Sequence, residues 1–295
     1  MGKIVYYIFI FPALFIVSLL PFFIVYAISD VLFILVYYVF GYRKKVVAQN
    51  LKNAFPEKST AELKVIEKKY YRFLCDVILE TIQTLTISKK TMLNRCKMND
   101  SSKAIFDHFN QKQQSCIIVL GHFGNWEWGG NAFSLTCNQQ LYVLYHPLSN
   151  KNFDGLMKKL RTRFGARLYS MKDAVREMIK NKNEVTATAF IADQTPAPET
   201  AYWTTFLNQD TPVFLGTEKI AKKLNFPVVY VSLHRFKRGH YEFNAELICA
   251  NPQGTSEGEI TELHTKCLEK DIISQPEIWL WSHKRWKHKR KQAYH

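Results

Sequence analysis

The sequence predicts an α/β protein with a mixed central sheet flanked by helices, preceded by a helical segment that anchors the chain in a membrane. From Cys116 onward, short apolar strand-like segments alternate with amphipathic helical patterns, which is typical of α/β domains. The first 41 residues are almost continuously apolar. We therefore divide the chain into a hydrophobic membrane-anchor segment, residues 1–41, and an α/β domain with a basic tail, residues 42–295.

The apolar N-terminal run is longer than one membrane crossing requires. In residues 4–41 the only formal charge is Asp30, whereas about 20 apolar residues span a bilayer. Pro21 divides the run. The first part, residues 4–20, is typical of a membrane helix, and residues 22–40 form either a second crossing or a helix lying in the interface against the domain. A cleavable signal peptide is disfavoured because the run is too long.

The chain is strongly basic, with a formal net charge of +15. A domain of this charge indicates an anionic partner, such as nucleic acid, phospholipid headgroups or an acidic protein. The basic cluster at residues 43–45 marks the cytoplasmic side of the membrane. Residues 283–295 hold six Lys or Arg residues and no acidic residue, which predicts either a solvated tail or contact with anionic headgroups.

The elements of the domain follow in order along the chain. Ser59 and Glu62 form a capping box that opens a long amphipathic helix reaching about residue 86. Glu80 falls among the apolar positions of this helix, so it is either exposed or directed at a site. Expected strands and helices then alternate: strands at 115–120, 141–145, 167–171, 185–192, 226–235 and 241–249, and helices at 151–164, 172–182, 217–224 and 256–272.

Six cysteines are scattered through the chain without a Cys-x-x-Cys pair. Several lie in apolar runs, where a free cysteine behaves as a small hydrophobic residue. The pattern indicates a reducing compartment, and we expect neither a metal site nor a cofactor.

One stretch carries a chemical signal. The expected strand at 115–120 ends at Gly121 and presents His122 at its C-terminal end, where open α/β sheets bind ligands. Glu127 follows five positions later. A neutral imidazole can accept a proton from a hydroxyl, and a nearby carboxylate can fix its tautomer. The spacing alone is equally compatible with a core histidine beside a surface glutamate.

Several motifs occur in a fixed order around this stretch. They are Val47–Leu51 with Phe55–Glu57, His122-x4-Glu127, Tyr145–Pro147 with Arg161–Gly165, Asp193–Gln194, Thr211–Gly216 and Trp279–Lys287. In this order they resemble the lysophospholipid-acyltransferase superfamily and, within it, the bacterial lipid A late acyltransferases, over about residues 21–287. Two features depart from the pattern and bear on the substrate: His146 replaces an arginine, and the segment after Glu127 is rich in Trp and Gly.

The resemblance implies a glycerolipid-acyltransferase-like fold and an enzyme of the bacterial inner membrane, with its catalytic domain on the cytoplasmic face. The implied reaction moves a fatty acyl chain from acyl carrier protein to a hydroxyl of a lipid A precursor. His122 is then the general base and Glu127 the group that orients it. No G-x-S-x-G elbow is present, which agrees with a mechanism without a covalent acyl-enzyme. Acyl carrier protein, a phosphorylated glycolipid and anionic inner-leaflet lipids would each account for the basic charge, and nucleic acid is not expected.

Further residues are expected to bind substrate: Asn125, Trp126, Arg161, Arg163, Asp193 and Gln194. The two arginines are able to bind phosphate or carboxylate bidentately, or to form surface ion pairs. Asp193 is able to hold one of them, bind a substrate hydroxyl or cap a turn. Backbone N–H groups after the strand, or Arg163, are expected to stabilise the oxyanion of the intermediate. Trp126 is expected to shape the acyl or acceptor pocket.

Other hypotheses remain open at this point. The same chemistry acts equally well on another glycolipid, an aminolipid or a lysophospholipid. A non-enzymatic, membrane-anchored binder of anionic polymer predicts no pocket at His122 and a single stripe of basic residues with interleaved aromatics. A hydrolase is disfavoured by the missing nucleophile elbow.

Overall fold

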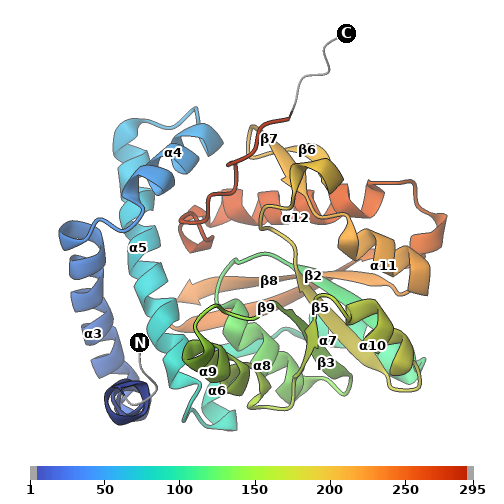
Figure 1. Ribbon diagram of the computed structural model, residues 1–295, viewed down its shortest axis with the longest axis horizontal. Helices are drawn as coiled ribbons and strands as arrows, with labels where there is room; N and C mark the ends of the chain where they lie inside the picture. Colours follow the sequence, from blue (N-terminus) through green and yellow to red (C-terminus); the bar gives the residue numbers. More distant parts are fainter. Residues whose placement is uncertain (1–4, 291–295) are drawn as a thin grey trace.

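The computed structural model describes residues 5–290, and within them a seven-stranded mixed sheet flanked by helices confirms the predicted fold class (Figure 1). The strand order is β1-β9-β8-β2-β5-β3-β4. Neighbouring strands are parallel except for the antiparallel pair β8 and β9. The strands are β1 (Cys96–Met98), β2 (Cys116–Leu120), β3 (Gln140–Tyr145), β4 (Arg167–Ser170), β5 (Thr186–Ile191), β8 (Val228–Lys237) and β9 (His240–Cys249).

Helices cover both faces of this sheet, and Figure 1 shows α11 and α12 on one side and α8 with α7 on the other. A separate antiparallel hairpin, β6 with β7, lies near α12. The domain's helices are α4 (Lys44–Ala54), α5 (Thr60–Gln83), α6 (Lys89–Arg95), α7 (Asp100–Gln111), α8 (Trp126–Thr136), α9 (Lys151–Thr162), α10 (Ala174–Lys180), α11 (Gly216–Leu224) and α12 (Glu259–Ser274), and the hairpin strands are β6 (Tyr202–Phe206) and β7 (Gln209–Val213).

Strand β2 lies in the middle of the sheet, between β8 and β5. A parallel strand covered by helices on both faces is buried on both of them, as the first four residues of β2 are, which explains why its sequence is continuously apolar instead of alternating. Its neighbours β8 and β5 run in the same direction, so the residues that follow β2 and β5 meet at one edge of the sheet. This edge is where His122 and Asp193 lie.

The capping box of α5 is confirmed. The Ser59 hydroxyl accepts from the backbone N–H of Glu62, and the Glu62 carboxylate accepts from the backbone N–H of Ser59 at 2.8 Å. The helix expected at 256–272 begins later than its range, because Ser256 and Glu259 pair but α12 begins only at Glu259. Gly258, at φ 86°, adopts a left-handed conformation that separates the pair from the helix.

The N-terminal segment is divided as the proline predicts. It consists of η1 (Tyr6–Ile10) and α2 (Phe11–Leu19), followed by α3 (Phe22–Ile34) and η2 (Leu35–Val39). Leu20, before the proline, is extended with ψ 145°, as the proline ring requires. Among the described residues one helix, Phe22–Val39, is long and apolar enough to cross a membrane, and Tyr6–Leu19 is a shorter apolar helix.

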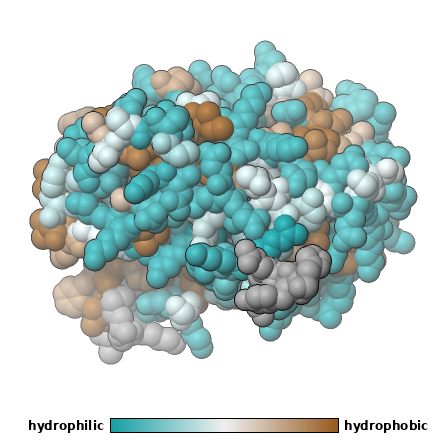
Figure 2. Space-filling view, turned by 90° about the horizontal axis from the view of Figure 1, so that it is seen from above, coloured by the Kyte–Doolittle hydropathy of each residue, from teal (hydrophilic) through white to brown (hydrophobic). Residues whose placement is uncertain are grey.

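Helix α3 packs along α5 (Figure 1) and is tied to the domain by polar groups. The Ser29 hydroxyl donates to the buried carboxylate of Asp76 at 2.6 Å. The Arg238 guanidinium, in the turn between β8 and β9, pairs with both Asp76 and Asp30 at 2.7 and 2.8 Å. The outer face of α3 is instead exposed and apolar, with Phe23 at 75% exposure. Figure 2 shows apolar residues gathered at the edge where the N-terminal helices lie.

Candidate active site

His122 lies between the end of β2 and the start of α8, and its ring is held by Asp193. The distance from His122 Nδ1 to Asp193 Oδ1 is 2.6 Å, and the His122 backbone N–H donates to Oδ2 at 2.8 Å. Because an ionised carboxylate only accepts, Nδ1 carries the proton of the neutral ring. Nε2 is therefore left with its lone pair free to accept a proton from a substrate.

Asp193 follows β5, the strand beside β2. Its carboxylate is buried and accepts a third hydrogen bond from the indole N–H of Trp279 at 2.8 Å. Burial alone raises the pKa of Asp193, but the contacts with His122 and Trp279 outweigh it and lower that pKa to about 2. The carboxylate is thus ionised and fixed in orientation at neutral pH.

The expectation that Glu127 orients His122 is wrong. The carboxylate of Glu127 accepts instead from Arg161, with Nε to Oε2 at 2.9 Å and Nη2 to Oε1 at 2.5 Å. Glu127 lies in the first turn of α8, on the side that faces α9, whereas Nδ1 of His122 faces β5. Burial lowers the pKa of Arg161, but the ion pair with Glu127 outweighs burial and raises that pKa above its usual value.

Asn125 and Arg163 are not among the residues that line the cavity beside His122, and both side chains pair with other parts of the chain. Asn125 is fully buried and is the N-cap of α8, where its Oδ1 accepts from the backbone N–H of Trp128 at 3.0 Å. Its Nδ2 donates to Glu80 at 2.7 Å. Arg163 donates to the backbone carbonyl of Thr84, just beyond α5. Both side chains therefore hold the protein's own loops.

A cavity beside His122 has a volume of about 660 Å³. His122, Arg161 and Gln194 are among its polar lining groups, and the amide nitrogen of Gln194 lies 3.5 Å from His122 Nε2. Much of the remaining wall is apolar, with Leu144, Met157, Val175, Phe190 and Ile220. A mostly apolar cavity with a few convergent polar groups is typical of a site for a ligand with a hydrocarbon chain.

Trp126 packs against the other side of the histidine. Its ring lies edge-on to the His122 ring, with centroids 4.9 Å apart, and its N–H donates to Glu127 at 3.2 Å. The turn before it needs a glycine: Gly124 has φ 64°, and a Cβ there would lie 1.9 Å from the carbonyl oxygen of Leu233. Only glycine allows the backbone of the histidine loop to lie this close to β8.

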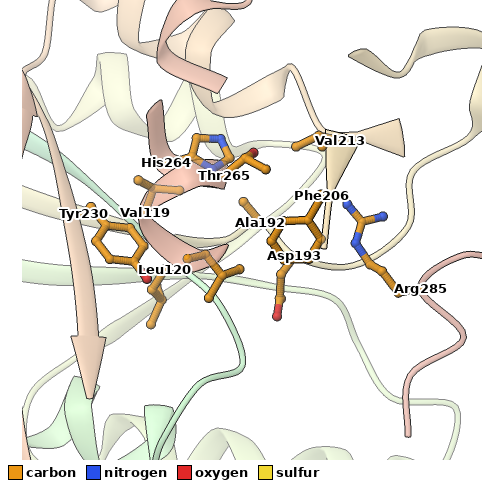
Figure 3. A pocket seen from close by; sticks show the side chains of 11 residues that line it. Val119, Leu120, Ala192, Asp193, Phe206, Val213, Tyr230, His264, Thr265 and Arg285 are labelled. Atoms are coloured by element: carbon orange, nitrogen blue, oxygen red, sulfur yellow. The ribbon is translucent and has the colours of Figure 1, made fainter. Parts of the chain in front are cut away.

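A much smaller internal cavity, about 10 Å³ in volume, lies beside the backbone of Asp193 (Figure 3). Figure 3 shows the carboxylate of Asp193 pointing away from His264. His264 and Arg285 are buried there, and burial lowers the pKa of His264 to about 4 and that of Arg285 to about 10. Arg285 donates to the carbonyl of Pro212 at 2.7 Å, so it fixes the C-terminal segment against β7.

Glu80 is fully buried, which rules out the exposed alternative. Its carboxylate accepts from Tyr26 of α3 at 2.9 Å, from Asn125 at 2.7 Å and from Tyr241 of β9 at 2.7 Å. Burial raises the pKa of Glu80, and the nearby Asp76 carboxylate raises it further. This one side chain joins the N-terminal segment, the histidine loop and the sheet.

We expect Glu80→Leu to lower the free energy of unfolding by about 3 kcal/mol or more, because each donor left without an acceptor in the interior costs about 1–3 kcal/mol. Thermal or denaturant unfolding in detergent measures this change. The matched control is Glu57→Leu, since the Glu57 side chain is 62% exposed, and a surface change of this kind stays within about 0.5 kcal/mol. Equal stability of the two variants would contradict the role of Glu80.

Sequence reasoning missed the contact of Trp279 with Asp193 and misassigned the partner of His122. Both Asp193 and His122 follow expected strands, and this was a sign that they could lie at the same edge of the sheet. The sequence does not show the strand order, which places β5 beside β2. Within residues 5–290, no group of three or more His, Cys, Asp or Glu side chains is arranged to hold a metal ion.

The comparison with protein families gives a match. A family model described as bacterial lipid A biosynthesis acyltransferase matches residues 3–288, nearly the whole chain. No curated protein matches the chain.

Proposed function

Because the chain belongs to the bacterial lipid A biosynthesis acyltransferase family, and is therefore an acyltransferase, we propose that it moves a fatty acyl chain from acyl carrier protein to a hydroxyl of a lipid A precursor, with His122 as the general base. The observation that carries this proposal is the His122–Asp193 pair at 2.6 Å beside a cavity of about 660 Å³. The pair supplies the base, and the cavity supplies the room for a hydrocarbon chain.

In the proposed reaction, the acceptor hydroxyl donates its proton to His122 Nε2 while its oxygen attacks the carbonyl carbon of the thioester. The tetrahedral intermediate then collapses, the C–S bond breaks, and the departing sulfur takes the proton from the imidazolium. The ionised carboxylate of Asp193 holds the ring in the required tautomer and stabilises its charged form. No covalent acyl-enzyme is formed.

We assign the oxyanion donors to Gln194 and Arg161, which line the cavity with His122. Two of the backbone N–H groups expected from sequence are engaged elsewhere: that of His122 donates to Asp193, and that of Gly124 donates to the carbonyl of Ile278 at 3.0 Å. Glu127 then acts on the reaction through Arg161, because the bidentate pair fixes the guanidinium. Glu127 is thus a positioning residue in this proposal.

We propose that residues 1–41 attach the protein to the bacterial inner membrane, with residues 42–295 as the acyltransferase domain on its cytoplasmic face. The exposed apolar side chains of the N-terminal helices support this attachment. Helix α3 is bound through Tyr26, Ser29 and Asp30 to charged groups of the domain. A spanning α3 would carry those groups into the hydrocarbon, where charges are costly. We therefore propose that α3 lies along the membrane surface.

The basic charge of +15 fits an acidic carrier protein, a phosphorylated acceptor and an anionic leaflet, and nucleic acid is no part of the proposal. The alternative of a non-enzymatic polymer binder predicted no pocket at His122, and the cavity argues against it. A different lipid acceptor, whether another glycolipid, an aminolipid or a lysophospholipid, is a second outcome of the experiment below.

Purified protein in detergent should be incubated with acyl carrier protein thioester and a lipid A precursor, and the product mass followed. The expected product has the mass of the precursor plus one fatty acid minus one water. Parallel reactions with a lysophospholipid and an aminolipid test the acceptor. Transfer to one of these and not to the lipid A precursor would overturn the proposed acceptor, and equal transfer from acyl-coenzyme A would overturn the proposed donor preference.

A further inference from the structure

The mouth of the His122 cavity carries large apolar side chains on its outside. Leu148 and Met171 line the cavity, yet they are 45% and 51% exposed. Leu148 lies in the loop between β3 and α9, and Met171 follows β4. Exposed apolar residues that gather at the entrance of a site are typical of an interaction surface, whereas single exposed apolar residues are ordinary.

A third apolar side chain connects this entrance to the N-terminal segment. Phe153, in the first turn of α9, is 36% exposed, and its ring lies edge-on to that of Tyr6 with centroids 5.8 Å apart. One turn further along α9, Met157 lines the cavity wall. We call Leu148, Phe153 and Met171 the apolar rim. Through the buried ring of Tyr6, the rim contacts the N-terminal segment, whose exposed apolar side chains we propose attach the chain to the membrane.

Two lysines lie beside residues of the apolar rim in the sequence. Lys172 also lines the cavity, and Lys151 begins α9. Among the described residues, neither Lys172 nor Lys151 forms an ion pair with an acidic side chain, and both are exposed. Apolar side chains flanked by free lysines are typical of surfaces that lie in the headgroup region of an anionic leaflet. Each lysine there contributes about 1 kcal/mol of attraction.

We propose that the apolar rim is a second membrane contact, which inserts into an anionic leaflet and opens the His122 cavity directly toward the lipids. The acceptor then passes from the leaflet into the cavity without crossing water. The proposal rests on the proposed function in one respect, that the acceptor is a membrane lipid. The acidic carrier protein is the other candidate for this surface, but three large apolar side chains, one of them in contact with the N-terminal segment, favour lipid.

Depth measurement tests the contact without relying on activity. In full-length protein, serine first replaces Cys137 and Cys267, the two cysteines that are not fully buried. A single nitroxide is then attached to the thiol introduced by Leu148→Cys, Phe153→Cys or Met171→Cys.

The matched control is Ile273→Cys on α12, where the native side chain is 60% exposed. Vesicles of phosphatidylethanolamine and phosphatidylglycerol serve as the membrane, and the accessibility of each nitroxide to oxygen and to a water-soluble nickel chelate is compared.

The three rim positions are expected to favour oxygen over the chelate, as sites within the acyl region do, and the position on α12 is expected to favour the chelate. Equal chelate accessibility at all four positions would overturn the second contact. Acyl transfer in detergent is measured separately, so a protein that fails the depth test can still pass the test of the proposed function, and the reverse also holds.

Phe153→Ser tests the functional consequence, since Phe153 is not among the residues that line the cavity. We expect the rate on a lipid A precursor embedded in vesicles to fall about fivefold to tenfold, a loss typical of one apolar side chain removed from an apolar contact. The rate on the same precursor in detergent micelles is expected to change less than about twofold. Ile273→Ser is the control. A higher KM for acyl carrier protein in micelles, with the vesicle rate unchanged, would assign the rim to the protein donor and overturn the lipid contact.

Discussion

Replacing His122 with alanine is expected to lower kcat for acyl transfer by about 10²- to 10⁴-fold, the contribution typical of a positioned general base. The alanine side chain cannot accept the hydroxyl proton, while the cavity and the proposed oxyanion donors Gln194 and Arg161 remain. KM for the acceptor should therefore change much less than kcat. Initial rates at saturating thioester, with the lipid A precursor in detergent, measure both constants.

The matched control for this change is His108→Ala, since His108 lies in the last turn of α7, away from the cavity. Thermal unfolding of both variants separates a lost base from a lost fold. A His122→Ala protein that unfolds like the wild type and retains its full kcat would exclude His122 as the base.

Asp193→Asn is expected to lower kcat by about 10³- to 10⁴-fold, close to the effect of removing the base itself. The Asp193 carboxylate accepts a hydrogen bond from His122 Nδ1–H, with 2.6 Å between Nδ1 and Oδ1. An asparagine that presents its amide nitrogen to Nδ1 stabilises the opposite tautomer. The proton then lies on Nε2, and the ring no longer acts as a base toward the acceptor. A carboxylate-to-carboxamide change beside a catalytic histidine acts in this way with a loss of about 10⁴-fold.

Glu127→Gln tests whether His122 is oriented by Asp193, as in the structure, or by Glu127, as expected from the sequence. The glutamine keeps the shape of the side chain but weakens the bidentate pair with Arg161. We expect a loss of about 10- to 100-fold, the size of a weakened charge-assisted contact, and therefore a smaller loss than in Asp193→Asn. The opposite ranking of the two variants would restore Glu127 as the partner of His122.

The elements that depend on local pattern were predictable from the sequence. Strand β2 is a continuous apolar run that ends at Gly121, and α5 opens with the Ser59–Glu62 capping box. The short edge strand β1 and the hairpin β6–β7 were not predicted. β1 has three residues, and β7 contains Pro212 and Asp210, residue types that are uncommon in strands. These elements form through tertiary pairing that leaves little local signal.

The sequence predicted which residues lie at the site better than it predicted which of them contact one another. His122, Arg161 and Gln194 line one cavity, and Asp193 is paired with His122. Their partners depend on which strands are neighbours and on how α8 and α9 pack, and neither is encoded in spacing. Asn125 illustrates the limit, because its fully buried position became evident only with Glu80, 45 positions earlier, as its hydrogen-bond partner.

The dependence of kcat/KM on pH, measured for the wild type and for His122→Ala, tests the central claim most directly. The contacts with His122 and Trp279 outweigh burial and lower the pKa of Asp193 to about 2, so this carboxylate stays ionised from pH 4.5 to 8 and adds no titration there. The account predicts that the wild-type rate falls tenfold per pH unit on the acid side as one group becomes protonated, and that the residual rate of His122→Ala lacks this fall. An identical acid-side fall in the two proteins would contradict His122 as the base.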